Sequence, residues 1–356
     1  MHIRFFNQIT KSDVPIAGGK GASLGEMTRA KISVPPGFVV LANAFDRFLE
    51  ETDLNTEIRA RLKEVNPEDI NSVERASVVI RDAIHDREMP KDLTEEILKG
   101  FDKLFDSITP RPPSIRRGDD RFVAVRSSAT AEDSSVASWA GELETYLNTT
   151  RENAVEMVKQ CWSSLFTPRA IFYRHEKKLI DHYVSVAVVV QKMIQSEISG
   201  IAFTVHPVTE DPDQMIIEAG FGLGEAIVSG QITPDSYVVS KSEMSILDIN
   251  IGVQNRKLIR DNAKSKVAGR SKLGNSEIAK LSDIEQEGYK SNKWVELSEG
   301  EGGRQKLTGK QIIEAAKLFK KIEEHYEFPC DIEWAMEGGQ IYITQSRPIT
   351  TLKHTG

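Results

Sequence analysis

The final part of the chain gathers two carboxylates, an amide and a guanidinium in one short alternating stretch. Asp331 and Glu333 alternate with apolar residues before a Gly-Gly pair, and Gln345 and Arg347 end the run that follows. Because side chains alternate between the two faces of a strand, Asp331 and Glu333 should share one face of a β-hairpin. Carboxylate and amide oxygens suit Mg²⁺, and arginine neutralises phosphate charge. The stretch favours a magnesium–nucleotide site, and a solvated acidic edge is the alternative.

The register of this hairpin decides whether Glu333 and Gln345 meet. Directly opposed residues point to the same side of a sheet, so these two share a face only if paired residue numbers have an even sum. A two-residue Gly338–Gly339 turn gives an odd sum. A three-residue loop over 337–339 gives an even sum and ends in a glycine that can take positive φ. We therefore predict the three-residue loop. The pairs that it implies are Met336 with Gln340 and Asp331 with Gln345.

Two earlier stretches place a basic residue among small ones. AGGKGASLGEM holds Lys20 in a glycine-rich loop that lacks Walker A spacing, and a plain turn is the alternative. VAVRSSATAEDSSVASWAGELET puts Arg126 at the end of a buried strand, before a run rich in Ser, Thr, Ala and Gly. Small residues let a ligand approach the backbone closely, and hydroxyl and amide groups can donate to phosphate oxygens. Both stretches favour phosphate binding over a solvated surface loop.

Two other features carry less information. The stretch EAGFGLGEAIVSG lacks the last glycine of the dinucleotide-binding fingerprint, so a structural turn and a ligand-contacting turn both stay open. The seven histidines are scattered, and none has metal-ligand spacing or a serine nucleophile motif nearby. We expect structural or solvated roles for these histidines.

Composition excludes several classes of partner. The chain has 356 residues, 39% of them hydrophobic, and a formal net charge of −7, which argues against a general electrostatic grip on nucleic acid or anionic membrane. The two cysteines, Cys161 and Cys330, form no CxxC pattern and predict a reduced, cytoplasmic protein without a disulfide framework or structural zinc. The longest apolar run, 184–190, is too short to span a membrane, and the N-terminus turns polar too early for a signal peptide.

The order of elements predicts an α+β fold with two lobes. Apolar residues at three- and four-residue spacing predict helices between 41 and 106, and a proline-rich stretch over 109–121 predicts a loop or joint. From residue 183 the pattern changes to apolar strands, and the polar stretch 255–305 shows little apolar period. A helix with Thr308 as its N-cap should then precede the hairpin.

Taken together and in this order, these stretches resemble the N-terminal nucleotide-binding domain of the phosphoenolpyruvate synthase and pyruvate phosphate dikinase family. The matching stretches are GGKGASLGEM, VPPGFVV, AVRSSATAED with AGELETYLN, SLFTPRAIFYR, VVQKMI, GLGEAIVSG, Pro234–Asp235, and DIEWA with ITQSRPIT. The resemblance implies an ATP-grasp-like domain that holds ATP and Mg²⁺ between two lobes. The N-terminal lobe, 1–180, would contain the Lys20 loop and a phosphate-lid loop. The strand-rich lobe, 181–356, would contain the magnesium-binding hairpin.

The resemblance also implies roles for individual residues. Lys20, Arg126 and Arg347 are the expected catalytic residues, and Glu333 and Gln345 are the expected magnesium ligands. The residues expected to contact ATP are Lys20 and Arg126 at the phosphates; Thr130, Ser138, Trp139, Ala140 and Gly141 in a loop over them; Gln191, Lys192, Met193 and Ile194 along the adenine; Glu197 or Glu218 near the ribose; and Asp331, Gln345 and Arg347 beside the metal.

In this family ATP is split to AMP, and the β-phosphoryl group passes to a histidine on a swivelling domain that serves an acceptor-substrate domain. No histidine in this sequence has the context of that phosphorylated residue. We therefore expect an excised domain or a split-gene subunit whose partners are those two domains. The same domain opens rifampin phosphotransferases, so an antibiotic phosphotransferase is one alternative. A nucleotide-sensing module that binds ATP without transfer is another.

Overall fold

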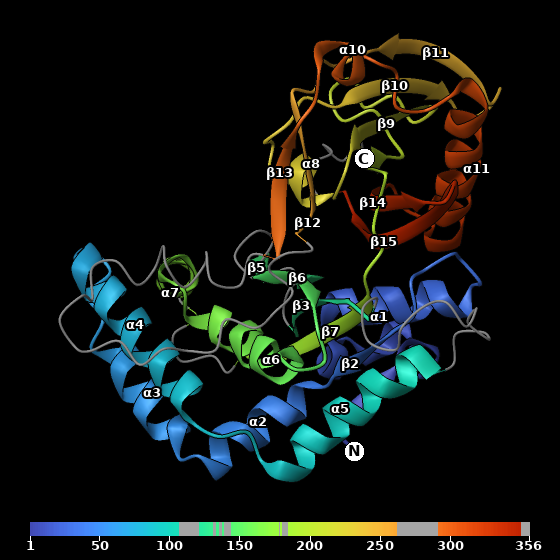
Figure 1. The fold of residues 1–356 in the computed structure, drawn as a ribbon. Helices are drawn as coiled ribbons and strands as arrows, with labels where there is room; N and C mark the ends of the chain where they lie inside the picture. The colour runs from blue at the N-terminus through green and yellow to red at the C-terminus, as the bar shows by residue number, and fades with distance from the viewer. Residues whose placement is uncertain are drawn as a thin grey trace. The chain divides into compact units, whose positions relative to one another are not determined.

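The structure, a computed structural model, describes residues 1–106, 121–130, 133–134, 137–138, 144–177, 179, 184–261 and 291–349. The chain divides into two compact units, each with helices and an antiparallel sheet (Figure 1). Unit 1 comprises Met1–Glu26, Pro36–Met193 and Ala263–Ser291, and unit 2 comprises Met27–Pro35, Ile194–Asn262 and Asn292–Gly356. This combination of helices and antiparallel sheets confirms the predicted α+β class.

The sheet of unit 1 has the strand order β1-β2-β7-β3-β6, and every neighbouring pair is antiparallel. Its strands are β1 (Ile3–Phe5), β2 (Gly37–Val40), β7 (Val186–Lys192), β3 (Val123–Ala129) and β6 (Thr145–Thr149). The central strand β7 is buried along nearly its whole length, as its unbroken apolar sequence requires. Because β7 pairs with both β2 and β3, unit 1 extends to Met193, whereas the change of pattern in the sequence suggested a boundary after residue 180.

Helices cover both faces of this sheet. They are α1 (Val14–Arg29), α2 (Ala42–Glu51), α3 (Leu54–Lys63), α4 (Ile70–Asp86), α5 (Lys91–Asp106), α6 (Ala154–Ser163) and α7 (Pro168–Glu176). The helices α2 to α5 confirm those predicted between 41 and 106. Helices α2, α5 and α6 contact strands β7, β2 and β3 on one face. Helix α1 lies on the other face, where a Cβ built on Gly21 would lie 3.0 Å from the Val39 side chain.

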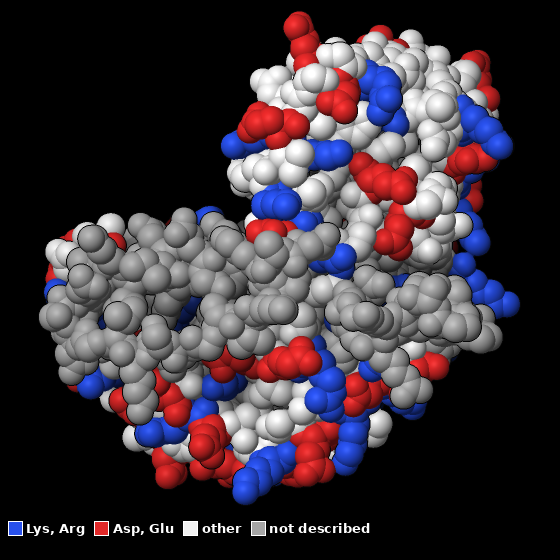
Figure 2. All heavy atoms as spheres, viewed as in Figure 1, with Lys and Arg blue, Asp and Glu red and all other residues white. Residues whose placement is uncertain are grey.

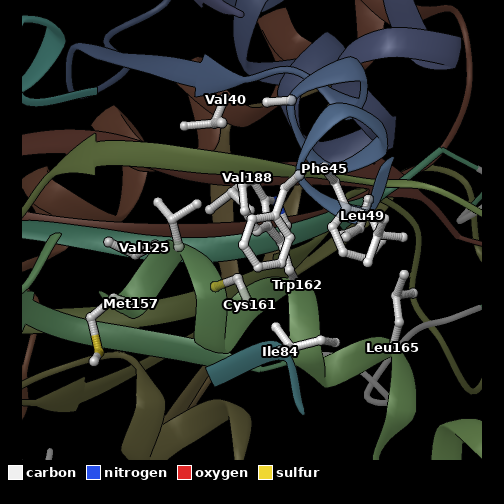
Figure 3. Close-up of a cluster of buried hydrophobic side chains, with 14 of the residues drawn as sticks. Val40, Phe45, Leu49, Ile84, Val125, Met157, Cys161, Trp162, Leu165 and Val188 are labelled. Carbon is white, nitrogen blue, oxygen red and sulfur yellow. The ribbon is translucent and has the colours of Figure 1, made fainter. Parts of the chain in front are cut away.

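The core of unit 1 is built around Trp162 (Figure 3). The ring centroid of Trp162 lies 5.4 Å from that of Phe45 and 5.2 Å from that of Phe48, and all three side chains are buried. Val125 of β3 and Val188 of β7 belong to the same cluster. Because strand side chains alternate, the neighbours of these valines face away from this core, toward α1. The aromatic cluster therefore decides which face of β3 is left for polar side chains.

The sheet of unit 2 has the strand order β11-β10-β9-β8-β14-β15, again with antiparallel neighbours. Its strands are β8 (Ile198–Phe203), β9 (Gln214–Phe221), β10 (Asp235–Ser240), β11 (Ser245–Asn250), β14 (Cys330–Glu337) and β15 (Gln340–Pro348). The unit also contains the helices α8 (Glu225–Val228) and α10 (Glu299–Gly302). The described ends of the polar stretch 255–305 are more regular than its sequence suggested, since β12 (Arg256–Arg260) pairs with β13 (Asn292–Glu296).

Helix α11 (Gly309–Tyr326) covers one face of the unit 2 sheet. Phe319 packs against Trp334 of β14, with ring centroids 6.2 Å apart. At the start of the helix, Thr308 Oγ1 accepts a hydrogen bond from Gln311 N at 3.3 Å, and Gln311 Oε1 accepts one from Thr308 N at 2.9 Å. This capping box satisfies two backbone donors and confirms Thr308 as the N-cap.

A buried ion pair joins β10 to the segment before α11. Lys306 Nζ lies 2.8 Å from Asp235 Oδ1, and neither side chain is exposed. The Tyr237 hydroxyl donates to Asp235 Oδ2 at 2.7 Å, and Gly252 N donates to Oδ1 at 3.0 Å. A buried carboxylate is tolerated only with such partners. The Pro234–Asp235 match noted in the sequence thus has a structural explanation within unit 2.

Charged side chains of both signs occur on the part of the surface that Figure 2 colours. On the face shown in Figure 2, acidic and basic side chains are interspersed over the residues that are coloured. Within the described ranges, no helix is both long enough and apolar enough to cross a membrane.

Candidate functional site

The tip of the β14–β15 hairpin differs from the predicted register. Glu337 pairs with Gln340, so Gly338 and Gly339 form a two-residue turn. Both glycines have positive φ, 58° and 78°, as in the type I′ turn that matches the natural twist of a hairpin. The predicted three-residue loop is therefore wrong, and so are its two implied pairs. The observed pairs are Met336 with Ile341 and Asp331 with Arg347.

A β-bulge at Thr344 nevertheless brings Glu333 and Gln345 together. Trp334 pairs with Ile343, but the register then shifts and Glu333 pairs with Gln345, which leaves Thr344 as the extra residue. If Thr344 were instead paired as a regular strand residue, it would oppose Glu333. Gln345 would then lie on the face that α11 covers. Glu333 and Gln345 therefore share the face of the sheet opposite α11.

A row of side chains crosses this face of the unit 2 sheet. Gln345 pairs with Glu333, Glu333 with Ile201 of β8, and Ile201 with Glu218 of β9. Directly opposed residues point the same way, so all four side chains lie on the side away from α11. Burial raises the pKa of the Glu218 carboxyl. The row thus connects Glu218, expected near the ribose, with the expected magnesium ligands.

Asp331 and Arg347 form an ion pair beside this row. Arg347 Nε and Nη2 lie 2.8 and 2.7 Å from Asp331 Oδ2. Burial raises the pKa of the Asp331 carboxyl, the Arg347 guanidinium lowers it, and Glu333 raises it further; the net direction is upward. We attribute the upward shift to burial, because the Asp331 side chain is only 13% exposed whereas Arg347, at 42%, is partly screened by solvent.

The donor set of the hairpin fits Mg²⁺ with a phosphate ligand. Among the described residues, no group of three or more His, Cys, Asp and Glu side chains is arranged to hold a metal ion by itself. Mg²⁺ usually takes one or two carboxylates and completes its octahedron with water and substrate phosphates. The carboxylate of Glu333 and the amide oxygen of Gln345 could supply such a partial set, and Arg347 could face the phosphates.

In unit 1, Arg126 and Gln191 lie on the same face of the sheet. Arg126 of β3 pairs with Val189 of β7, and Ala124 pairs with Gln191. Because Val125 faces the aromatic core, Arg126 and Gln191 are on the face that carries α1. Both side chains are buried, at 8% and 3% exposure. The arginine that ends the apolar strand in the sequence is thus held inside the unit and is not a solvated loop residue.

Lys20 lies in a helix and not in the predicted glycine-rich loop. Residues Val14–Arg29 are helical except at Gly18, whose φ of 68° and ψ of 170° break the helix into two parts. Gly21 N donates to Ser128 Oγ at 3.3 Å, and Ser128 Oγ donates to Ala17 O at 3.1 Å. These bonds join the broken part of α1 to β3. The structure therefore brings the Lys20 segment to the strand that carries Arg126.

Thr130 anchors the end of β3. Its hydroxyl and its N–H both donate to the Ser185 carbonyl oxygen, at 3.1 and 3.2 Å. Ser185 Oγ in turn donates to Asp46 Oδ1 at 2.7 Å. A short ribbon of β4 (Asp133–Ser134) and β5 (Ala137–Ser138) follows β3. Outside the described residues lie the side chain of Ser138 and the whole of Trp139, Ala140 and Gly141.

The segment expected along the adenine passes from one unit to the other. Lys192 N and Met193 N donate to carbonyl oxygens of unit 1, at 2.8 and 2.9 Å. Ile194 is the first residue of unit 2 here, and Glu197 N donates to Met336 O at 3.0 Å. Since the N–H groups of Lys192, Met193 and Glu197 already have acceptors, contacts from these three residues to a base would use carbonyl oxygens or side chains.

The sequence did not reveal an open pocket of about 210 Å³ in unit 2. Its lining residues come from three separate segments and are Gln195, Ser196, Leu223, Ile259 and Arg260. Ser196 Oγ donates to Gly222 O at 2.9 Å, and Gly222 has φ of 94°. The glycine-rich stretch thus forms a tight turn beside an open pocket, and Leu223 of this stretch lines that pocket.

The sequence of this chain matches a known family of nucleotide-binding domains. The family model described as the pyruvate phosphate dikinase AMP/ATP-binding domain matches residues 14–356. The chain therefore belongs to this family, and the resemblance seen in the sequence is confirmed.

Curated relatives are longer proteins. The probable phosphoenolpyruvate synthases of Methanocaldococcus jannaschii and Archaeoglobus fulgidus are 42% and 43% identical to this chain over 354 residues. The phosphoenolpyruvate synthase of Pyrococcus furiosus is 39% identical over 387 residues. Each alignment covers 99% of this chain but only 27%, 42% and 44% of the respective relative. The chain thus spans less than half the length of these relatives.

Proposed function

We propose that this chain is the ATP-binding domain of a dikinase-type phosphotransferase similar to phosphoenolpyruvate synthase. The observation that carries the proposal is the pairing of Glu333 with Gln345, beside the Asp331–Arg347 ion pair, on one sheet face of a chain from an AMP/ATP-binding family. Two oxygen donors and a guanidinium on one face suit a metal-bound polyphosphate.

The proposed chemistry needs positioning and charge neutralisation more than covalent participation by the protein. Phosphoryl transfer spreads negative charge over the equatorial oxygens, and cations that stabilise this charge account for most of the catalysis. Unit 1 supplies Lys20 and Arg126 for this purpose, and unit 2 supplies Arg347. When bound, Mg²⁺ would be held by Glu333 and Gln345 and would offset the phosphate charge. An ATP-grasp-like fold is part of the proposal.

The proposed roles of the other residues follow the same division. Thr130 and the segment Ser138–Gly141 would contact the phosphates, and Gln191 to Ile194 would contact the adenine. Glu218 is favoured over Glu197 for the ribose, because Glu218 lies in the row that contains Glu333.

The proposed acceptor of the β-phosphoryl group is a histidine on a separate domain. The named relatives are more than twice as long as the part that this chain matches, which leaves room for a histidine domain and an acceptor-substrate domain. The names of these relatives favour a phosphoenolpyruvate synthase-like protein over the antibiotic phosphotransferase alternative. ATP and these two domains are therefore the proposed partners.

Calorimetric titration with ATP, ADP and AMP, each with and without Mg²⁺, tests the proposal. We expect ATP to bind more tightly with Mg²⁺ than without it, and the Glu333→Gln variant to lose that difference. Glu324→Gln, which removes an exposed carboxylate from α11, is the matched control and should behave as the unsubstituted chain. Failure of the chain to bind ATP under either condition contradicts the proposal.

A further inference from the structure

The Ser128 side chain bridges the break in α1. Its hydroxyl donates to Ala17 O, just before the break, and accepts from Gly21 N, just after it. The two contacts therefore bracket residues 18–20, which include Lys20. Ser128 is completely buried, so solvent does not compete for this hydroxyl.

The break explains why a hydroxyl is needed at this place. At the end of a helical segment the last carbonyl groups lack donor partners, and at the start of the next the first N–H groups lack acceptor partners. Buried backbone groups are strongly destabilising when they stay unpaired. A single hydroxyl can donate one hydrogen bond and accept another, so Ser128 satisfies Ala17 O and Gly21 N together.

Gly18 permits this close approach. A Cβ built on Gly18 would lie 2.2 Å from Ser128 Oγ and 2.3 Å from Ser128 O, well inside van der Waals contact. Its φ of 68° is also in the region that L-residues rarely adopt. The glycine and the serine are therefore complementary parts of one contact between α1 and β3.

The same contact fixes Lys20 relative to Arg126. Side chains alternate along β3, so Ser128 and Arg126 lie on the same face, toward α1. The two hydrogen bonds of Ser128 therefore tie the segment that carries Lys20 to the strand face that carries Arg126.

We propose that Ser128 is a positioning residue that holds the Lys20 segment against the Arg126 strand, so that both cations meet the same polyphosphate. The identity of that ligand rests on the function proposed above. Ser128 itself need not touch the nucleotide. Ser128 affects binding only by positioning Lys20. Its substitution should therefore matter less when Lys20 is absent, whereas a residue that only stabilises the fold would matter equally in both cases.

Ser127 offers a matched control on the same strand. It is also buried, at 1% exposure, but it faces the aromatic core. Ser127 Oγ donates to Glu144 O at 2.7 Å and accepts from Ser164 Oγ at 3.2 Å. Ser127→Ala therefore removes a buried hydroxyl from β3 and leaves the contact with residues 17 and 21 in place.

A double-mutant cycle on MgATP affinity tests the proposal. The variants are Ser128→Ala, Lys20→Ala, Ser127→Ala and the combinations of each serine variant with Lys20→Ala. Ser128→Ala should weaken MgATP binding about tenfold when Lys20 is present but less than about twofold in the Lys20→Ala background, because coupled sites are not additive. Ser127→Ala should change affinity by less than about twofold in either background. Ser128→Cys keeps a side chain of similar shape with a weaker donor and should show the same coupling in a chain that folds.

The outcomes separate this inference from the function on which it rests. No MgATP binding by the unsubstituted chain contradicts the proposed function and the inference with it. Normal binding that is equally weakened by Ser128→Ala with and without Lys20 contradicts only the positioning role. Unchanged affinity in both Ser128 variants contradicts that role as well. Thermal unfolding of every variant is followed by circular dichroism. Affinities are compared only among the variants that this measurement shows to be folded.

Discussion

Glu333 on β14 and Gln345 on β15 oppose each other directly. The two-residue turn between their strands gives paired residue numbers an odd sum, which by itself would put these two side chains on opposite faces of the sheet. The bulge between the turn and this pair reconciles the two facts. A metal site that depends on both oxygens therefore depends on the backbone as much as on the side chains.

Replacing Glu333 with glutamine should abolish the magnesium dependence of ATP binding. A neutral amide is a poorer ligand for a hard cation than a carboxylate, so Mg²⁺ would no longer be recruited. Calorimetry with and without Mg²⁺ measures the difference, with Glu324→Gln as the charge-matched control. A retained magnesium dependence in Glu333→Gln would remove this carboxylate from the metal site.

Replacing Arg126 with alanine should nearly abolish phosphoryl transfer in the longer protein that contains the histidine domain. Loss of an arginine that stabilises the transition state costs on the order of 10³–10⁵ in rate. Circular dichroism should show a folded chain. Arg151→Ala, which breaks a two-point ion pair with Asp102 elsewhere in unit 1, is the control and should keep its activity. Turnover above about a tenth of the unsubstituted rate is incompatible with this role for Arg126.

The chain by itself should bind MgATP but release almost no AMP in the steady state. No described side chain is identifiably placed to orient water for in-line attack, and the proposed acceptor is a histidine elsewhere. Adding a histidine domain in trans should produce AMP and labelled protein from β-labelled ATP. The rate should stay below that of a linked protein, whose linker raises the effective concentration to the order of millimolar. Rapid AMP release by the chain alone points to a self-contained hydrolase instead.

Removing the buried lysine of unit 2 should strongly destabilise the fold. Lys306→Met leaves Asp235 buried without its counter-charge, and breaking such a pair typically costs about 3–5 kcal/mol. Urea unfolding followed by tryptophan fluorescence measures the loss. Lys310→Met removes an exposed lysine 3.7 Å from Glu314 and should cost less than about 1 kcal/mol. Equal effects of the two substitutions contradict the structural importance of the buried pair.

Acid should weaken unit 1 through Glu156. Burial raises the pKa of this carboxyl, but the His85 ring, whose Nδ1 lies 3.3 Å from Oε1, and the charge of Lys159 outweigh burial and hold the pKa below its ordinary value of 4.5. The carboxyl thus stabilises the folded chain above pH 4.5, and this contribution is lost as the pH falls through the lowered pKa. Glu156→Gln should cost about 1–2 kcal/mol at pH 7 and show less acid dependence.

Urea unfolding at pH 7 and at pH 3 makes this comparison. Glu152→Gln, at an exposed position just before α6, should follow the unsubstituted chain at both pH values. An acid dependence that is the same in Glu156→Gln and in the unsubstituted chain excludes this carboxyl as a source of the effect.

Local sequence patterns predicted a helix or strand well where the pattern lay within that one element. The apolar spacing and the Thr308 cap predicted α11, and the alternation around Asp331 predicted a hairpin. The place of β7 was not predictable from its apolar run, because its partners β2 and β3 are distant in the sequence. The bulge was missed because Thr344 has nothing in its residue type to distinguish it from a regular strand position.

The site was predictable in its residue types but less in its geometry. The sequence indicated Lys20 and Arg126 separately, yet gave no sign that Ser128 joins their segments. Ser127 and Ser128 are identical in type and adjacent in the chain, and the packing of β3 against the core around Trp162 places Ser128 on the side of α1. Such distinctions arise from tertiary contacts that no local pattern records.

The bulge at Thr344 also divides the hairpin into two regions with separate duties. Beyond the bulge, the tip belongs to the architecture of unit 2: Ile343 N donates to Ser33 O at 2.8 Å. On the other side of the bulge, the open end of the hairpin carries the Glu333–Gln345 and Asp331–Arg347 pairs. Deletion of Thr344 would leave Glu333 opposite Gln345, since the two strands would then run in register without an extra residue. A related chain could therefore lack residue 344, or have a different tip, and still keep Glu333 opposite Gln345.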